Sequence, residues 1–363
     1  MKKIIITLVI IIIAIIGGIF FVNTYESETD VTKNATKVGV ILNGYKDDKS
    51  WSQSHYDGIM KTAEQLNLNI ICEEYVAAED VLEIVKRLVE NDCKIIIANS
   101  AIYSEHMVKA AELYPEVFFF HATGTSSRKN LSTYFGRMYQ MRYLTGIAAG
   151  LQTKTDEIGY VAAFPISEVN RGINAFTLGV RSVNPDAKVY VRWINSWTDD
   201  EAAASTSENL ISEHNIDILA MHTDSLEPLR VSHEHDIMSI GYNVDNHAIY
   251  PSSCLTSAVW DWEKFYTPHI LKCLQGKFEG TNYWESSDTG IMDIAPLSFN
   301  AKLEITEVVE AEKERLHSGT FDVFYGPIYD NAGNMRIAEG ETMTDNAMLN
   351  EFDWYVEGVV IDE

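Results

Sequence analysis

The chain has 363 residues, 46% of them hydrophobic and 22% charged, so it is long enough for two globular domains, each with its own core. The formal net charge of -25 excludes nucleic-acid binding through a broad basic surface, because an acidic protein repels phosphate backbones. The same charge repels anionic lipid headgroups, so contact with a membrane would need a dedicated anchor.

An apolar run over residues 4–22 follows Lys2 and Lys3 and could supply that anchor. A helix of this length rises about 28 Å, close to the thickness of a bilayer core. We therefore expect a signal or anchor helix over residues 1–22 and a flexible tether over 23–36. A secretory apolar region is usually shorter, about 7–15 residues, which favours a retained anchor over a cleaved signal peptide. Both readings place the body outside the cytoplasm, anchored to the cell membrane or secreted.

Beyond the tether, short apolar runs alternate twice over with segments of helical spacing. The runs 38–42 (VGVIL), 94–98 (KIIIA) and 117–121 (VFFFH) are typical of buried parallel strands. A second set begins at 158–163 (IGYVAA). Two successive sets of this kind predict an α/β fold with two doubly wound lobes of parallel sheet joined by a hinge.

The late segments are expected to cross between the lobes and to complete both sheets. We place residues 37–157 and about 259–300 in the first lobe, and residues 158–258 and about 301–363 in the second. Strands are expected at 290–293 and 321–326. The segment 140–152 is rich in glycine and alanine and predicts a closely packed helix.

Ligands of doubly wound sheets bind beyond the carboxyl ends of the strands. The loops at these positions carry amides, hydroxyls and large aromatic side chains rather than pairs of titratable groups. Aromatic faces can stack on a flat heterocycle, and amides can bond its polar edge. The predicted ligand-binding residues are Trp51, Asn99, Tyr103, Trp197, Tyr242, Asn243, Asp245 and Trp260. A single aromatic residue is more often part of a core, so Trp51 and Trp197, which fall in the segments after strands at the starts of helices, carry the most weight.

The sequence offers little support for catalysis, a cofactor or a metal. It contains no phosphate-binding loop, nucleophile elbow or zinc-protease motif. The run 233–235 (HEH) is more typical of a solvated surface than of a metal site. Four cysteines match no zinc or redox spacing and are expected as buried thiols, with disulfides Cys72–Cys93 and Cys254–Cys273 left open.

Several motifs resemble, in the same order, the basic membrane protein family of ABC-importer substrate-binding proteins, the purine nucleoside receptor group. They are 50–54 (SWSQS), 134–150 (YFGRMYQMRYLTGIAAG), 162–197 (AAFPISEVNRGINAFTLGVRSVNPDAKVYVRWINSW) and 240–246 (IGYNVDN). The resemblance covers residues from about 37 to at least 262. It implies a type I periplasmic-binding fold with a hinged cleft, a purine-type ligand and ABC permease subunits as partners.

Position by position, the resemblance places Trp51 at a base-stacking Phe and Trp197 at the second aromatic clamp. Asn243 stands at an Asp position, and Trp260 stands where nucleoside binders carry a Lys that reaches the ribose. Loss of that Lys removes a partner of the sugar, which favours a free base such as adenine over a nucleoside. The expected protein is a monomeric, extracytoplasmic solute-binding protein. The alternative is a membrane-tethered receptor that signals to a partner protein.

Overall fold

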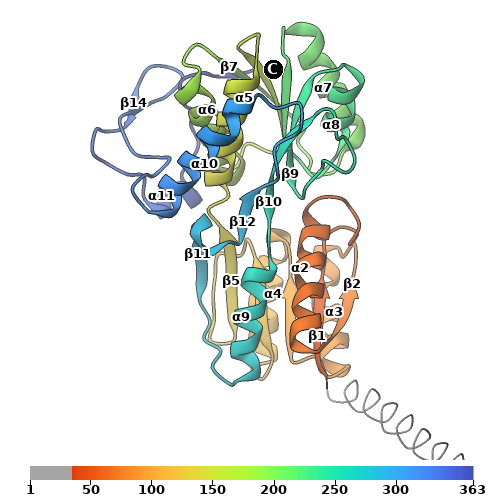
Figure 1. The fold of residues 1–363 in the computed structure, drawn as a ribbon. Coiled ribbons are helices and arrows are strands. Elements are labelled where there is room, and N and C mark those ends of the chain that lie inside the picture. The colour runs from red at the N-terminus through yellow and green to blue at the C-terminus, as the bar shows by residue number, and fades with distance from the viewer. Residues whose placement is uncertain (1–34, 363) are drawn as a thin grey trace, which may run out of the picture.

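The computed structural model describes residues 35–362 as two lobes stacked end to end, each built on one largely parallel sheet flanked by helices (Figure 1). This arrangement confirms the predicted α/β fold with two doubly wound lobes. The predicted signal or anchor helix and nearly all of the tether lie outside the described residues; the first strand, β1, begins at Thr36. Within residues 35–362, no helix combines the length and apolarity that a membrane span needs.

The first lobe contains a six-stranded sheet with the order β11-β5-β4-β3-β1-β2, and every neighbouring pair in it is parallel. Its strands are β1 (Thr36–Ile41), β2 (Leu68–Glu73), β3 (Ile95–Ala98), β4 (Phe118–Ala122), β5 (Leu131–Gly136) and β11 (Asn282–Glu285). Its helices are α2 (Trp51–Leu66), α3 (Val81–Glu90), α4 (Ser104–Leu113) and α9 (Glu263–Leu274). The isoleucine-rich and phenylalanine-rich runs of β3 and β4 are buried on both faces, as continuous apolar strands should be.

The second lobe contains a seven-stranded sheet with the order β12-β10-β9-β8-β6-β7-β15, in which only the β10–β12 pair is antiparallel. Its strands are β6 (Glu157–Ala162), β7 (Lys188–Trp193), β8 (Ile218–His222), β9 (Met238–Asn243), β10 (Cys254–Trp260), β12 (Met292–Ile294) and β15 (Val359–Ile361). Its helices are α5 (Tyr139–Gln152), α6 (Ser167–Val183), α7 (Asp200–Glu213), α8 (Glu227–Glu234), α10 (Leu303–His317) and α11 (Asp345–Asn350), with a small hairpin of β13 (Ile328–Tyr329) and β14 (Met335–Ile337).

Three segments cross between the lobes, and their positions differ from the expected boundaries. The crossings join β5 to α5, β10 to α9, and β11 to β12. Residues 259–300 were expected in the first lobe, but β12 pairs with β10 of the second sheet. Helix α5 was expected in the first lobe as well, and it packs on α6 of the second lobe because glycines let the two backbones approach closely.

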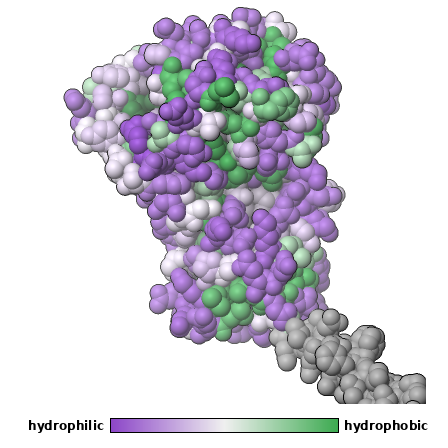
Figure 2. All heavy atoms as spheres, in the orientation of Figure 1, coloured by the Kyte–Doolittle hydropathy of each residue, from purple (hydrophilic) through white to green (hydrophobic). Residues whose placement is uncertain are grey.

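The segment 321–326 was predicted as a strand and forms none in the structure, apart from one bridge between Tyr325 and Thr342. Its residue Phe324 contributes to the core instead: the side chain is fully buried and packs on Tyr139 and Phe352. The four cysteines are free thiols, of which Cys72 is half-buried and the others are buried. Hydrophilic side chains cover most of the face drawn in Figure 2, as the high acidic charge leads one to expect.

Candidate ligand-binding site

The carboxyl ends of the strands in the two sheets face each other, and polar side chains join the lobes there. Ser50 precedes α2 in the first lobe, and its hydroxyl donates to Asp224 Oδ1 in the second lobe at 2.9 Å. Asn243, the last residue of β9, donates through Nδ2 both to Ser50 Oγ and to Asp224 Oδ1, each at 2.9 Å. We call Ser50, Asp224 and Asn243 the polar junction.

The start of α2 is fixed by Asp48. Its carboxylate accepts hydrogen bonds from the backbone N–H groups of Ser50 at 2.8 Å, Ser52 at 2.9 Å and Gln53 at 3.0 Å. These bonds satisfy N–H groups that have no partner inside the helix. As a result the first turn of α2 holds Ser50 and Trp51 in a defined position against the second lobe.

Trp51 lies in an aromatic cluster at the hinge and remains half-buried. Its ring makes edge contacts with Trp260 at 6.0 Å and with Trp262 at 5.7 Å between ring centroids. Trp260 and Trp262 stack on each other at 4.3 Å. The indole N–H of Trp51 donates to the carbonyl oxygen of Asn99 at 2.7 Å, which fixes the orientation of the ring.

Trp197 stands on the opposite lobe and is also half-buried. Its ring lies 5.9 Å from Phe164 and 6.2 Å from His222, and its carbonyl oxygen accepts from the backbone N–H of Asp224 at 2.7 Å. Trp51 is the chain neighbour of Ser50, so each tryptophan is tied to one side of the polar junction. The structure thus brings Trp51 and Trp197 to the same meeting point of the lobes.

The two amides predicted to read a ligand edge are occupied by protein groups. Asn99 accepts from the backbone N–H of Asn43 at 2.9 Å and donates to Ser52 Oγ at 3.3 Å. Asn243 uses Nδ2 within the polar junction and accepts from the indole N–H of Trp260 at 3.1 Å. Both are almost completely buried. In this arrangement the Asn243 amide positions Trp260 and the polar junction, whereas Asn99 positions Trp51 through its backbone carbonyl oxygen.

The other predicted ligand-binding residues lie either in the protein core or at a recess beside the hinge. Tyr103 is fully buried in a separate core of the first lobe, where its hydroxyl donates to the carbonyl oxygen of Val76 at 2.7 Å. The short helical turn over 101–103 directs it there, so it does not join the others. Tyr242 is 3% exposed and lies under the guanidinium of Arg142 at 3.8 Å. Asp245 and Trp260 line a recess of about 290 Å³ beside the hinge.

Two carboxylates that the prediction omitted, Asp224 in the polar junction and Glu168 near it, remain partly exposed. Burial, followed by the nearby Asp48 carboxylate, raises the pKa of Asp224 to about 7, although a hydrogen bond from Ser50 opposes the shift. Burial also raises the pKa of Glu168, while Arg171 and Arg142 oppose it. Asp224 lies two residues after the end of β8, so its place near a strand end was the sequence signal that could have identified it.

We expect Asp224 to make the stability of the protein depend on pH. Its pKa is raised from the usual 3.8 to about 7, so between these values the unfolded chain loses a proton that the folded chain keeps. The contribution of Asp224 to folding is therefore complete below about pH 4 and is lost as the pH rises to about 7. Relative to the parent, Asp224→Asn should gain about 1–2 kcal/mol in the free energy of unfolding across that range, measured by urea denaturation. Parallel pH profiles for the two proteins would show that Asp224 titrates normally.

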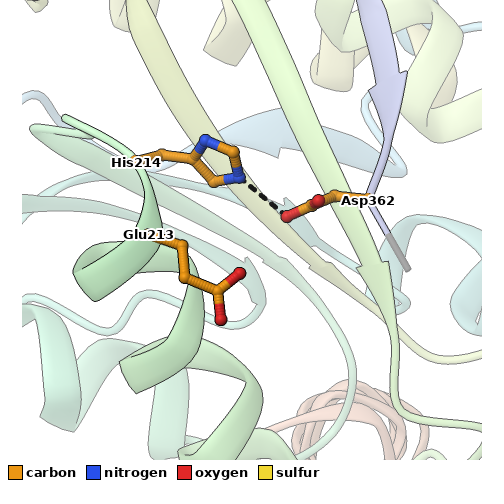
Figure 3. Close-up of side chains that lie close together, drawn as sticks. All are labelled: Glu213, His214 and Asp362. Carbon is orange, nitrogen blue, oxygen red and sulfur yellow. Dashed lines mark hydrogen bonds and ion pairs between the residues drawn. The ribbon is translucent and has the colours of Figure 1, made fainter.

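Glu213, His214 and Asp362 form the one cluster among the described residues with ligand atoms close enough for a metal ion (Figure 3). His214 Nε2 lies 2.8 Å from Asp362 Oδ2. Arg192 makes ion pairs with Asp362 at 2.7 Å and with Glu213, so it already supplies positive charge between the carboxylates. We therefore interpret the cluster as an ion-pair network that connects Asp362 to the end of α7. His233 and His235 contact separate partners, Ser253 and Glu208.

Comparison with known proteins gives consistent results for fold and family. Residues 35–318 match the Bmp family, described as ABC transporter substrate-binding protein, PnrA-like. A purine-binding protein of Brucella abortus is 32% identical over 326 residues, which cover 89% of this chain and 92% of that protein. A Haloferax volcanii protein named as a glucose-binding component of an ABC transporter is 34% identical over 313 residues, 86% of this chain and 77% of that protein.

Among solved structures, an ABC transporter solute-binding protein from Conexibacter woesei superimposes with a TM-score of 0.69 at 17% sequence identity. The match covers 79% of this chain and 98% of that structure, and at this identity it concerns the fold. The expected resemblance of the sequence motifs is thus confirmed. The chain belongs to the Bmp family of PnrA-like ABC transporter substrate-binding proteins.

Proposed function

We propose that this substrate-binding protein holds a purine-type heterocycle, with an adenine-like base favoured, in a cleft between its two lobes. The observation that carries the proposal is the placement of Trp51 and Trp197. Each is half-buried, each comes from a different lobe, and each is tied to one side of the polar junction. Stacking of a base on an aromatic side chain contributes about 1–3 kcal/mol.

Asp224 and Glu168 supply the polar recognition in this proposal. A carboxylate accepts hydrogen bonds from an exocyclic amine, and a protonated carboxyl group can donate as well. With a pKa of about 7, Asp224 is available in both forms near neutral pH, which suits an adenine edge with an adjacent donor and acceptor. Trp260 stacks on Trp262 and offers no amine to a ribose, so a free base fits better than a nucleoside.

Ligand capture would proceed by closure of the hinge. The hydrogen bonds of Ser50 with Asp224 and Asn243 join residues of different lobes and therefore form only when the lobes meet. A ligand that contacts both lobes binds the closed form better than the open form and shifts the population toward it. The closed form would then be the one that the ABC permease recognises.

The site of action is also a proposal. The apolar segment over residues 4–22 would hold the body outside the cell, anchored to the membrane or released after cleavage. A tethered receptor that signals to another protein would use the same cleft, and a neighbouring permease and ATPase in the genome would favour transport. The Haloferax relative makes a sugar the second ligand class, because aromatic rings and carboxylates also suit sugar faces and hydroxyls.

We expect adenine to raise the thermal midpoint of the purified protein. A ligand at 100 times its dissociation constant stabilises the folded state by about 2.7 kcal/mol, which gives a shift of several degrees. Hypoxanthine, adenosine and glucose, tested at the same concentrations, separate the ligand classes. Stabilisation by glucose alone would replace the purine with a sugar, and no shift with any nucleobase or nucleoside would contradict the proposal.

A further inference from the structure

The C-terminal segment over residues 319–362 follows the part of the chain that matches the family, residues 35–318. In Figure 1 its hairpin and α11 lie at one side of the second lobe, beside α6 and α10. Its end, β15, adds the edge strand next to β7, with Val360 opposite Tyr190. The segment is thus built into the second lobe.

Helix α6 carries polar side chains that find their partners in this segment. Asn174 Nδ2 donates to the carbonyl oxygen of Trp354 at 2.8 Å, and its Oδ1 accepts from the backbone N–H of Val356 at 2.9 Å. Asn170 Nδ2 donates to the carbonyl oxygen of Phe352 at 2.8 Å. Both asparagines are almost fully buried. Because a buried polar group without a partner is costly, this face of α6 depends on the segment to satisfy it.

The same segment reaches the crossings between the lobes. Arg137 lies in the first crossing, between β5 and α5, and its backbone N–H donates to the carbonyl oxygen of Glu285 at the end of β11 at 2.9 Å. Its guanidinium meets Asp345, the first residue of α11, in a two-pronged ion pair, with Nη1 2.8 Å from Oδ1 and Nη2 2.9 Å from Oδ2. Such paired contacts are the geometrically most specific type of ion pair.

Trp284 of β11 connects this contact to the candidate site. The guanidinium carbons of Arg137 and Arg171 lie 5.3 Å and 4.9 Å from the centre of its ring. Arg171 belongs to α6 in the second lobe and donates to the carbonyl oxygen of Met348 in the C-terminal segment at 2.6 Å. The ring of Trp284 stacks with Phe135 at 6.1 Å, and Phe135 contacts the ring of Trp51 at 6.2 Å.

We propose that residues 319–362 form a strap that holds the hinge in the closed arrangement of the lobes. Arg171 belongs to the second lobe, and Asp345 belongs to the strap. Trp284, in contrast, belongs to the first sheet, and Arg137 directly follows β5 of the same sheet. A rotation that opens the lobes therefore has to break or rearrange the contacts of Arg137 and Arg171 around Trp284. The strap raises the barrier to opening and slows the release of ligand. The proposal rests on the two-lobed closure but not on the identity of the ligand.

The test compares two ion pairs that the strap makes with the body. Asp345→Asn removes the pair with Arg137 at the crossing, and Glu357→Gln removes the pair with Arg181 of α6, at 3.1 Å, within the second lobe. Both carboxylates are more than half exposed, so neither change should disturb the core. The readout is hydrogen exchange of the backbone amides in the three crossings of the full-length, ligand-free protein, with the thermal midpoint as a control.

We expect Asp345→Asn to raise exchange in the crossings about two- to fivefold, the range of a single partly exposed ion pair, and Glu357→Gln to leave it unchanged. Trp284→Leu, which removes the ring between the two guanidinium groups, should give a larger increase. Equal exchange in Asp345→Asn and Glu357→Gln would overturn the strap. Because no ligand is present, this outcome is separate from a failure of purine binding; with a binding purine in hand, Asp345→Asn should speed its dissociation by a similar factor.

Discussion

Trp197→Ala is expected to weaken purine binding at least tenfold. The ring is half-buried on the second lobe, where it lies at an angle to the rings of Phe164 and His222 rather than stacked on either of them. A tenfold loss of affinity corresponds to about 1.4 kcal/mol, which lies within the range of about 1–3 kcal/mol that a stacking aromatic side chain contributes. Isothermal titration calorimetry with adenine measures the change directly.

The fold should tolerate this substitution, because the bond from Asp224 to residue 197 uses the backbone carbonyl and survives in alanine. Trp193→Ala provides the matched control. Trp193 is also half-buried, but it lies on β7 and packs on Tyr355 of the C-terminal segment at 6.4 Å. We expect its removal to lower stability and to leave affinity unchanged. An unaltered affinity for Trp197→Ala would take that residue out of the site.

The architecture was predictable because a parallel strand that is buried on both faces has a continuous run of apolar residues in its sequence. The run VGVIL forms most of β1, and the run VFFFH forms most of β4. The segments of helical spacing between the runs likewise became helices, α2 and α6 among them. Local patterns of this kind are decided by burial within a few turns of chain, so a single sequence contains them.

The crossings and the late strands were harder to place because their partners are distant in the sequence. β12 is three residues long and pairs antiparallel with β10. The composition of such a short strand does not indicate which strand it pairs with. The segment 321–326 is apolar enough for a strand, yet it contributes Phe324 to a core shared with α5. Tertiary contacts outweighed local preference in both cases.

In the candidate site, too, the sequence predicts what depends on local position and does not predict what depends on distant contacts. The structure brings Trp51, Trp197 and Asn243, which were chosen for their positions after strands, to the place where the lobes meet. Position after a strand could not show that Asn243 has both ends of its amide occupied, because its partners are distant in the sequence: Ser50 precedes α2 and Trp260 ends β10. Nor could it distinguish Asp224, which keeps partial exposure, from Tyr103, which a short helical turn directs into the core.

The small residues of α5 were expected to permit close packing, and the structure shows that glycines of both α5 and α6 take part in it. A Cβ atom on Gly179 would lie 2.0 Å from the carbonyl oxygen of Tyr143, and one on Gly146 would lie 2.1 Å from that of Phe176. Real Cβ atoms do not approach backbone so closely, so an added methyl group has to push the helices apart. The contact is reciprocal, with each helix offering a glycine to the other's backbone.

Gly179→Ala should therefore lower the free energy of unfolding by a net of about 1–2 kcal/mol, measured by urea denaturation. Overpacking of a tight interface costs about 1–3 kcal/mol or more and here outweighs the roughly 1 kcal/mol that alanine gains over glycine in a helix. Ser182→Ala, on the exposed side of the same helix, should change stability by less than about 0.5 kcal/mol. Because α5 begins at the first crossing and carries Arg142, whose guanidinium packs over the ring of Tyr242, displacement of α5 should also weaken ligand binding. A Gly179→Ala protein as stable as its parent would mean that the helices are not in backbone contact.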